Sequence, residues 1–102
     1  MAESPLSGIG NLIKLNDYCV VTFASTSGAL KGEKLMKAAE REFVIMPTPR
    51  EITTSCGLSL KIRLEDAEES CRVLREGGVE ISGVYQLTRE GNKRSIILLY
   101  PE

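Results

Sequence analysis

The sequence predicts a single α+β domain, and three observations indicate this class. The 102 residues are 42% hydrophobic and 26% charged, which is the composition of one ordinary folded domain. Segments with alternating apolar and polar residues, typical of strands, are separated by two segments in which apolar residues recur at helical spacing. Gly, Pro and Asn lie between these segments and indicate turns. We therefore expect an antiparallel sheet with two helices on one of its faces.

The chain divides into a leader, residues 1–17, and one domain, residues 18–102. The leader contains turn-forming Ser, Pro and Gly and has weak periodicity, so it can be disordered. It holds no apolar stretch of signal-peptide length, and no segment approaches the roughly 20 apolar residues of a membrane span. We expect a cytoplasmic protein that does not enter a membrane.

The first strand is expected over residues 18–23, because the run YCVVTF is rich in β-forming residues. Its residues Cys19, Val21 and Phe23 share one face, which we assign to the core. Hydroxyl residues at 25–27 then supply N-caps for a helix. The inner stripe of that helix contains Gly28, Gly32, Leu35, Met36 and Ala39.

The second and third strands are separated by a polar loop. The second strand, residues 43–46, ends at Pro47-Thr48-Pro49, because proline lacks an amide donor. Residues 50–57 form the loop. In the third strand Leu58, Leu60, Ile62 and Leu64 alternate with Ser59, Lys61 and Arg63. This period of two predicts one core face and one face in water.

A second helix and two further strands complete the domain. Glu65 and Asp66 place acid at the helix start, and Gly77-Gly78 ends it. Its inner stripe contains Leu64, Ala67, Cys71 and Leu74. The fourth strand, residues 79–88, is interrupted by Gly83, and a turn at 90–93 leads to the fifth, residues 95–100. The order β-α-β-β-α-β predicts a ferredoxin-like split βαβ arrangement with an extra C-terminal strand.

Charge and residue usage exclude several classes of function. The formal charge is −1, from 13 basic and 14 acidic residues, so the chain has no long-range attraction for nucleic acid. The absence of His removes Ser/His/Asp and Cys/His catalysis. The three Cys are odd in number and match no zinc spacing. We expect a reduced, cytoplasmic protein with no metal and no cofactor.

Cys56 is the cysteine that no regular core stripe explains, because it lies where the polar loop meets the third strand. In the predicted topology this loop lies at the end of the sheet where the first helix begins. A helix N-terminus and nearby cations lower the pKa of a thiol, and the thiolate is the nucleophile. The candidate helpers are the amides of Ser27 and Gly28, the guanidinium of Arg50, the hydroxyls of Thr53, Thr54 and Ser55, and the small Gly57. The alternative is that Cys56 is an inert core residue.

Three segments resemble the selenium/sulfur carrier-like family: YCVVTFAST at 18–26, EKLMK at 33–37 and PTPREITTSCGL at 47–58. The resemblance extends from Tyr18 to Leu87 and leaves out the leader and the last strand. It implies that Cys56 holds sulfur or selenium as a persulfide or selenosulfide and relays it between donor and acceptor proteins of bacterial or archaeal metabolism. The family has Ser-Ser-Ser where this chain has Thr53-Thr54-Ser55. The resemblance implies a carrier or sulfurtransferase relay rather than a turnover enzyme.

Two other functions stay open from the residues. One is a non-enzymatic interaction or regulatory module in which Cys56 is structural. The apolar strand Ile96–Tyr100 would then dock a partner or form a homodimer, unless it pairs only with the fourth strand and lies under the leader. The other is RNA binding, which the scaffold class suggests, but the third strand presents Ser59, Lys61 and Arg63 rather than aromatic side chains. We therefore expect no nucleic-acid partner.

Overall fold

The computed structural model describes residues 16–52 and 56–100, and the predicted leader lies outside these ranges except for Asn16 and Asp17. Its sheet has five strands in the order β2-β3-β1-β4-β5, and each neighbouring pair is antiparallel. The strands are β1 (Tyr18–Phe23), β2 (Val44–Pro47), β3 (Leu58–Ile62), β4 (Ile81–Glu90) and β5 (Lys93–Tyr100). The predicted α+β class, with an antiparallel sheet and two helices, is confirmed.

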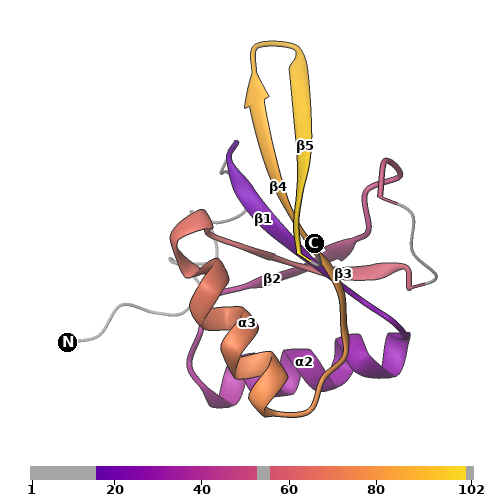
Figure 1. The fold of residues 1–102 in the computed structure, drawn as a ribbon, viewed down its shortest axis with the longest axis vertical. Helices are drawn as coiled ribbons and strands as arrows, with labels where there is room; N and C mark the ends of the chain where they lie inside the picture. The colour runs from indigo at the N-terminus through magenta and orange to yellow at the C-terminus, as the bar shows by residue number, and fades with distance from the viewer. Residues whose placement is uncertain (1–15, 53–55, 101–102) are drawn as a thin grey trace.

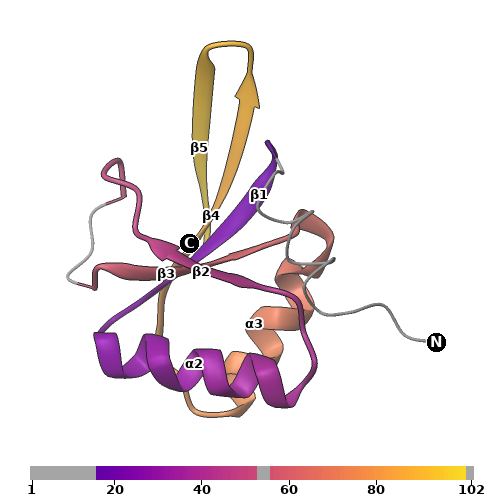
Figure 2. The same ribbon diagram turned by 180° about the vertical axis from the view of Figure 1, so that it is seen from behind.

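Both α-helices cover the same face of the sheet (Figures 1 and 2). They are α2 (Thr26–Ala38) and α3 (Ala67–Glu76), and a 3₁₀ turn, η1 (Leu64–Asp66), precedes α3. Helix α2 begins at the predicted hydroxyl cluster, where the Ser25 side chain accepts a hydrogen bond from the Gly28 amide at 3.1 Å. Helix α3 ends at the predicted glycine pair, and Gly78 has a φ of +83°, which favours glycine.

The buried stripe of α2 differs in part from the prediction. It contains Ala29, Gly32 and Met36. Gly28 lies in the capped first turn and Ala39 follows the last turn, so neither is buried in the core. A Cβ atom at Gly32 would lie 3.1 Å from the Phe23 ring, so the helix approaches the sheet closely at this glycine.

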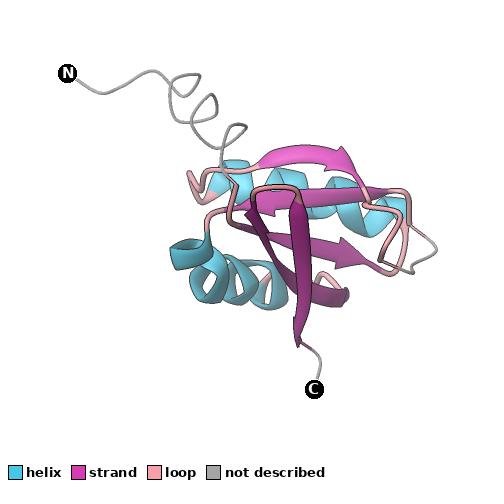
Figure 3. Ribbon diagram, turned by 90° about the horizontal axis from the view of Figure 1, so that it is seen from above, coloured by secondary structure: helices cyan, strands magenta, loops and turns pink. Residues whose placement is uncertain are grey.

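The main core lies between the sheet and the two helices. It contains the predicted core face of β1, together with Leu60 and Ile62 of β3. A second, smaller cluster lies on the opposite face of the sheet and consists of Val20, Ile52 and Leu87. We call this the open face, because no α-helix of the described residues covers it (Figure 3). Ile52, from the predicted polar loop, covers part of it.

The expectation of a water-facing side of β3 is wrong for two of its residues, because Ser59 and Lys61 are buried. β3 has strands on both sides, and residues from outside β3 contact Ser59 and Lys61. Ser59 forms a hydrogen bond with Thr48 at 2.6 Å. The Lys61 ammonium lies 4.1 Å from the centre of the Tyr18 ring, and burial lowers the pKa of Lys61.

The strand ends also differ from the predicted ones. Strand β2 continues through Pro47. Because β2 is an edge strand, the nitrogen of Pro47 can face away from β3, where no strand needs an amide donor. The β4–β5 hairpin is longer than predicted and turns at Gly91-Asn92, with Glu90 paired to Lys93. Gly91 has a φ of +60°, which suits glycine in so tight a turn. Over the residues that the structure describes, no helix is long and apolar enough to span a membrane.

Candidate functional site: the Cys56 loop

The loop that carries Cys56 connects β2 to β3 and lies at the end of the sheet where α2 begins (Figures 1 and 2). The register explains this position. Thr22 near the end of β1 pairs with Ser59 near the start of β3. The residues before β3 and those after β1 therefore occupy the same end of the sheet.

Cys56 is buried at the top of the main core, with 2% of its surface exposed. Its thiol donates a hydrogen bond to the carbonyl oxygen of Leu58 at 3.3 Å. The sulfur atom is therefore turned toward the start of β3 rather than toward water. An incoming reagent reaches it only when the loop changes conformation.

Thr48 holds the carbonyl groups on both sides of Gly57. Its amide donates to the Gly57 carbonyl at 2.9 Å, and its hydroxyl donates to the Cys56 carbonyl at 3.0 Å. Because a hydroxyl has one proton, the 2.6 Å contact between Thr48 and Ser59 is donated by Ser59. Thr48 and Ser59 were not among the predicted site residues. The signal available in the sequence was the hydroxyl of Thr48 between Pro47 and Pro49, directly after the predicted second strand.

A second set of contacts anchors the loop to the open face. Ile52 is buried against Val20 and Leu87, and its amide donates to the Pro49 carbonyl at 3.0 Å. Glu51 forms an ion pair with Arg94 of β5 at 3.6 Å. The loop is thus held at Thr48, at Ile52 and by one surface ion pair.

The structure shows the Cys56 thiol bonded to Leu58, which was not a predicted helper, and describes the predicted helpers as follows. Thr53, Thr54 and Ser55 lie outside the described residues. Arg50 and Ser27 are exposed. The Gly28 amide donates to the Ser25 side chain, so the N-cap uses it. Gly57 is exposed, and a Cβ there would meet no atom within 4 Å, so neighbouring atoms do not require a glycine.

The other two cysteines lie in regular elements of the main core. Burial raises the pKa of Cys19 in β1 to about 11, and the nearby Cys71 thiol adds to the shift. Burial also raises the pKa of Cys71 in α3, and Arg75 opposes this in part. Both side chains are therefore protonated thiols at neutral pH. Residues 16–52 and 56–100 contain no group of three Cys, Asp or Glu side chains placed to hold a metal ion.

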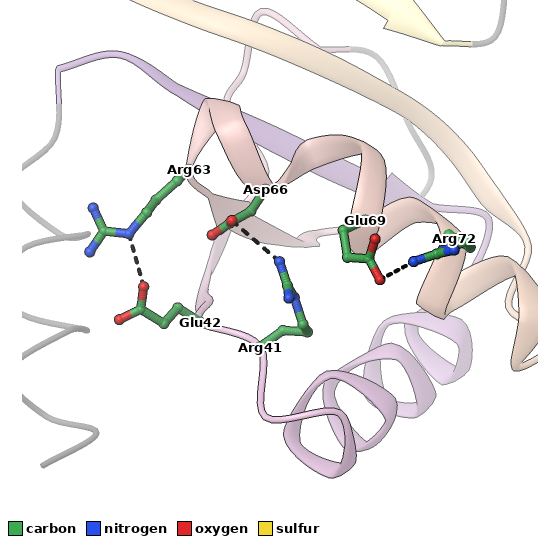
Figure 4. A network of polar contacts seen from close by, with 6 residues as sticks. All are labelled: Arg41, Glu42, Arg63, Asp66, Glu69 and Arg72. Atoms are coloured by element: carbon green, nitrogen blue, oxygen red, sulfur yellow. Dashed lines mark hydrogen bonds and ion pairs between the residues drawn. The ribbon is translucent and has the colours of Figure 1, made fainter. Parts of the chain in front are cut away.

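A network of charged side chains lies where the end of α2 meets the start of α3, away from the Cys56 loop (Figure 4). Arg63 donates to Glu42 at 2.9 Å, and this bond raises the pKa of Arg63. Arg41 donates to Asp66 at 3.3 Å. Glu69 accepts from Arg72, which lowers the pKa of Glu69.

Beside this network is a groove of about 730 Å³ whose lining includes Phe43 and Ile45. The ion pairs Arg63–Glu42 and Arg41–Asp66 join the segment before β2 to the segment at η1. None of the predicted site residues lies there.

These features define a small α+β domain whose distinctive element is a cysteine-bearing loop folded against an antiparallel sheet. A family model described as "Putative Se/S carrier protein-like" matches residues 18–86, which is more than half of the chain. The chain belongs to this family, as its resemblance predicted. The match includes the Cys56 loop and ends in β4, so the leader and β5 lie outside it. No curated protein and no solved structure matches the chain.

Proposed function

We propose that the protein is a carrier that holds a sulfur or selenium atom on Cys56 and relays it from a donor protein to an acceptor protein. The observation that carries this proposal is the difference between Cys56 and the other two cysteines. Cys19 and Cys71 belong to a strand and a helix of the main core. Cys56 belongs to a connection whose backbone Thr48 positions through two hydrogen bonds. The family also supports a carrier rather than a turnover enzyme.

The proposed transfer requires no oxidant or reductant. The Cys56 thiolate attacks the outer sulfur of a donor persulfide, the donor's S–S bond breaks, and the donor leaves as a thiolate that takes up a proton. Cys56 then carries the persulfide. An acceptor thiolate attacks its outer sulfur, a new S–S bond forms on the acceptor, and Cys56 returns to a thiolate. With selenium the same steps pass through a selenosulfide.

The loop must move for either step, because the Cys56 thiol is buried and bonded to Leu58. In this proposal Arg50 and the amide of Ser27 attract the thiolate once it is released, and the positive end of the α2 dipole adds to this near Gly28, whose amide stays bonded to Ser25. Thr53, Thr54 and Ser55 donate hydrogen bonds to the loaded sulfur, and Gly57 admits the partner's backbone. The protein acts in the cytoplasm, where thiols stay reduced.

We also infer that the domain is a ferredoxin-like split βαβ unit extended by β5. β3 lies between β1 and β2 and runs antiparallel to both, which supports this inference. β4 lies on the other side of β1. In such a unit the β2–β3 connection and the first helix start at the same end of the sheet, which is where Cys56 lies.

The proposal is tested by loading the purified protein with a small-molecule persulfide and measuring its intact mass. Wild type is expected to gain one sulfur atom, and Cys56→Ser is expected to gain none. Cys19→Ala and Cys71→Ala are the matched controls, and both should still load. Peptide mapping then locates the added atom. Equal loading of Cys56→Ser, or a wild type that does not load, would contradict the carrier proposal.

The burial of Cys56 favours one alternative, a protein-interaction module in which this cysteine is structural. In that case Cys56→Ala lowers the free energy of unfolding by about 1 kcal/mol or more through a small cavity. The folded wild type would then also resist alkylation at Cys56 as strongly as at Cys19. Donor and acceptor proteins belong to the carrier proposal, whereas docking or self-association through Ile96–Tyr100 belongs to the interaction module.

A further inference from the structure

Strand β5 is an edge strand with exposed apolar side chains on both of its faces. It is last in the strand order, has eight residues and contains no proline. Ile97 and Leu98 are 52% and 51% exposed, and consecutive residues of a strand point to opposite faces. The β4–β5 hairpin projects beyond the rest of the sheet, so the helices do not block its outer edge (Figures 1 and 2).

The opposite edge of the sheet is protected against strand pairing. β2 has four residues and ends in Pro47, which has no amide to donate. Short length and proline are the usual ways in which edge strands avoid pairing. Among the strands that the structure describes, β5 is therefore the edge that another strand can extend.

The charges of β5 favour one orientation of such a strand. Lys93 and Arg94 are the charged residues of β5, and both lie at its turn end. A parallel copy of β5 would place these cations side by side, which is unfavourable. An antiparallel copy places the Lys93–Arg94 pairs of the two strands at opposite ends of the interface. Arg94 is also held by Glu51 of the Cys56 loop, so this end of the strand is already partly neutralised.

We propose that β5 pairs antiparallel with β5 of a second copy of this chain, so that one sheet continues across a dimer. The two-residue turn makes Glu90–Lys93 a hydrogen-bonded pair, and the pattern alternates along the hairpin. The backbone groups of Arg94, Ile96 and Leu98 consequently point to the outer edge. A pair centred on Ile97 places the two Ile97 side chains opposite each other and Ile96 opposite Leu98.

Pairing of β5 with β5 of a second copy produces a dimer and no larger assembly. The arrangement is two-fold symmetric and uses the same strand of each copy. The second edge of each sheet ends in Pro47 and does not continue the assembly into a fibre. The inference uses residues outside the family match and is independent of the carrier proposal.

Sedimentation velocity of the full chain over a concentration series, with a reductant present, tests the proposal. Wild type is expected to shift from monomer to dimer as concentration rises. Ile97→Lys places two like charges together at the centre of the interface and should raise the Kd by at least about tenfold. Leu98→Lys should act in the same direction. Leu30→Lys is the matched control, since Leu30 is 46% exposed on α2, and it should leave the Kd unchanged.

Thermal unfolding of each variant checks that these exposed substitutions leave the fold intact. A wild type that is monomeric at every concentration would overturn the proposal and leave β5 to the leader or to a different protein. A dimer that persists unchanged in both β5 variants would overturn it as well, because the interface would then lie elsewhere.

Discussion

Thr48 shows how one side chain positions the candidate site. Its hydroxyl accepts from the buried Ser59 and donates to the Cys56 carbonyl, while its amide bonds to Gly57. A hydroxyl with one proton satisfies both partners because it donates and accepts at once. The conformation of the chain at Cys56 therefore depends on a residue eight positions earlier.

Replacing Thr48 with valine should destabilise the protein. Thr48→Val keeps the shape but leaves Ser59 without this partner, and a buried unsatisfied hydroxyl costs about 1 to 3 kcal/mol. Thr48→Ser retains the hydroxyl and should lose less. Urea unfolding monitored by circular dichroism measures the difference. A valine variant as stable as wild type would show that the hydrogen bonds at Thr48 contribute little.

The loop between β2 and β3 is the element that decides whether Cys56 can react. Ile52 attaches it to the open face, on the opposite side of the sheet from the core that holds the Cys56 side chain. The ion pair of Glu51 with Arg94 is largely exposed and contributes at most about 1 kcal/mol. Of these two contacts on the far side of the loop, Ile52 is therefore the stronger anchor.

Truncating the anchor should expose the thiol. Ile52→Ala removes most of the contact with Val20 and Leu87, so the loop opens more often and alkylation of Cys56 becomes faster. Peptide mapping after timed alkylation gives the rate for each cysteine. Cys19 serves as the internal control, because a rise at both residues would indicate global unfolding. Ile45→Ala on β2 is the matched substitution, and there the rate at Cys56 should stay at the wild-type value.

At the scale of the whole molecule, two thiols of the main core make the stability of the protein depend on pH in the alkaline range. Cys19 and Cys71 lie together in it, and burial raises the pKa of each. In the unfolded chain Cys19 returns to its ordinary pKa of 9.0, whereas in the folded protein it titrates at about 11. Above pH 9 the unfolded chain therefore binds fewer protons, and the free energy of unfolding falls as pH rises.

This stabilisation is complete below pH 9 and is lost as pH rises through about 11. We expect wild type to lose up to about 2 to 3 kcal/mol more than Cys19→Ala across that interval. The lowered pKa of Lys61 acts in the opposite direction, but both proteins share it, so it cancels in the comparison. Denaturant unfolding at several pH values measures the effect. Parallel pH profiles of the two proteins would contradict it.

The strands, helices and their caps could be predicted from local patterns, because each depends on neighbours in sequence. β1 occupies the predicted range, α2 begins at the hydroxyl cluster and α3 ends at the glycine pair. The prediction was wrong where burial depends on distant segments. Alternation shows that Ser59 and Lys61 share a face of β3, but it does not show that Thr48 bonds to Ser59 or that the Tyr18 ring lies against Lys61.

The residues alone were sufficient to identify the α+β class, the order of its elements, the absence of histidine chemistry and Cys56 as the distinctive cysteine. These properties follow from composition, periodicity and a family motif, which are all local. The fold decided that Thr48 bonds to Cys56, that Ile52 is an anchor rather than part of a polar loop, and that β5 has an open edge. Each of these depends on strand order and register, which bring together residues that are far apart in the chain.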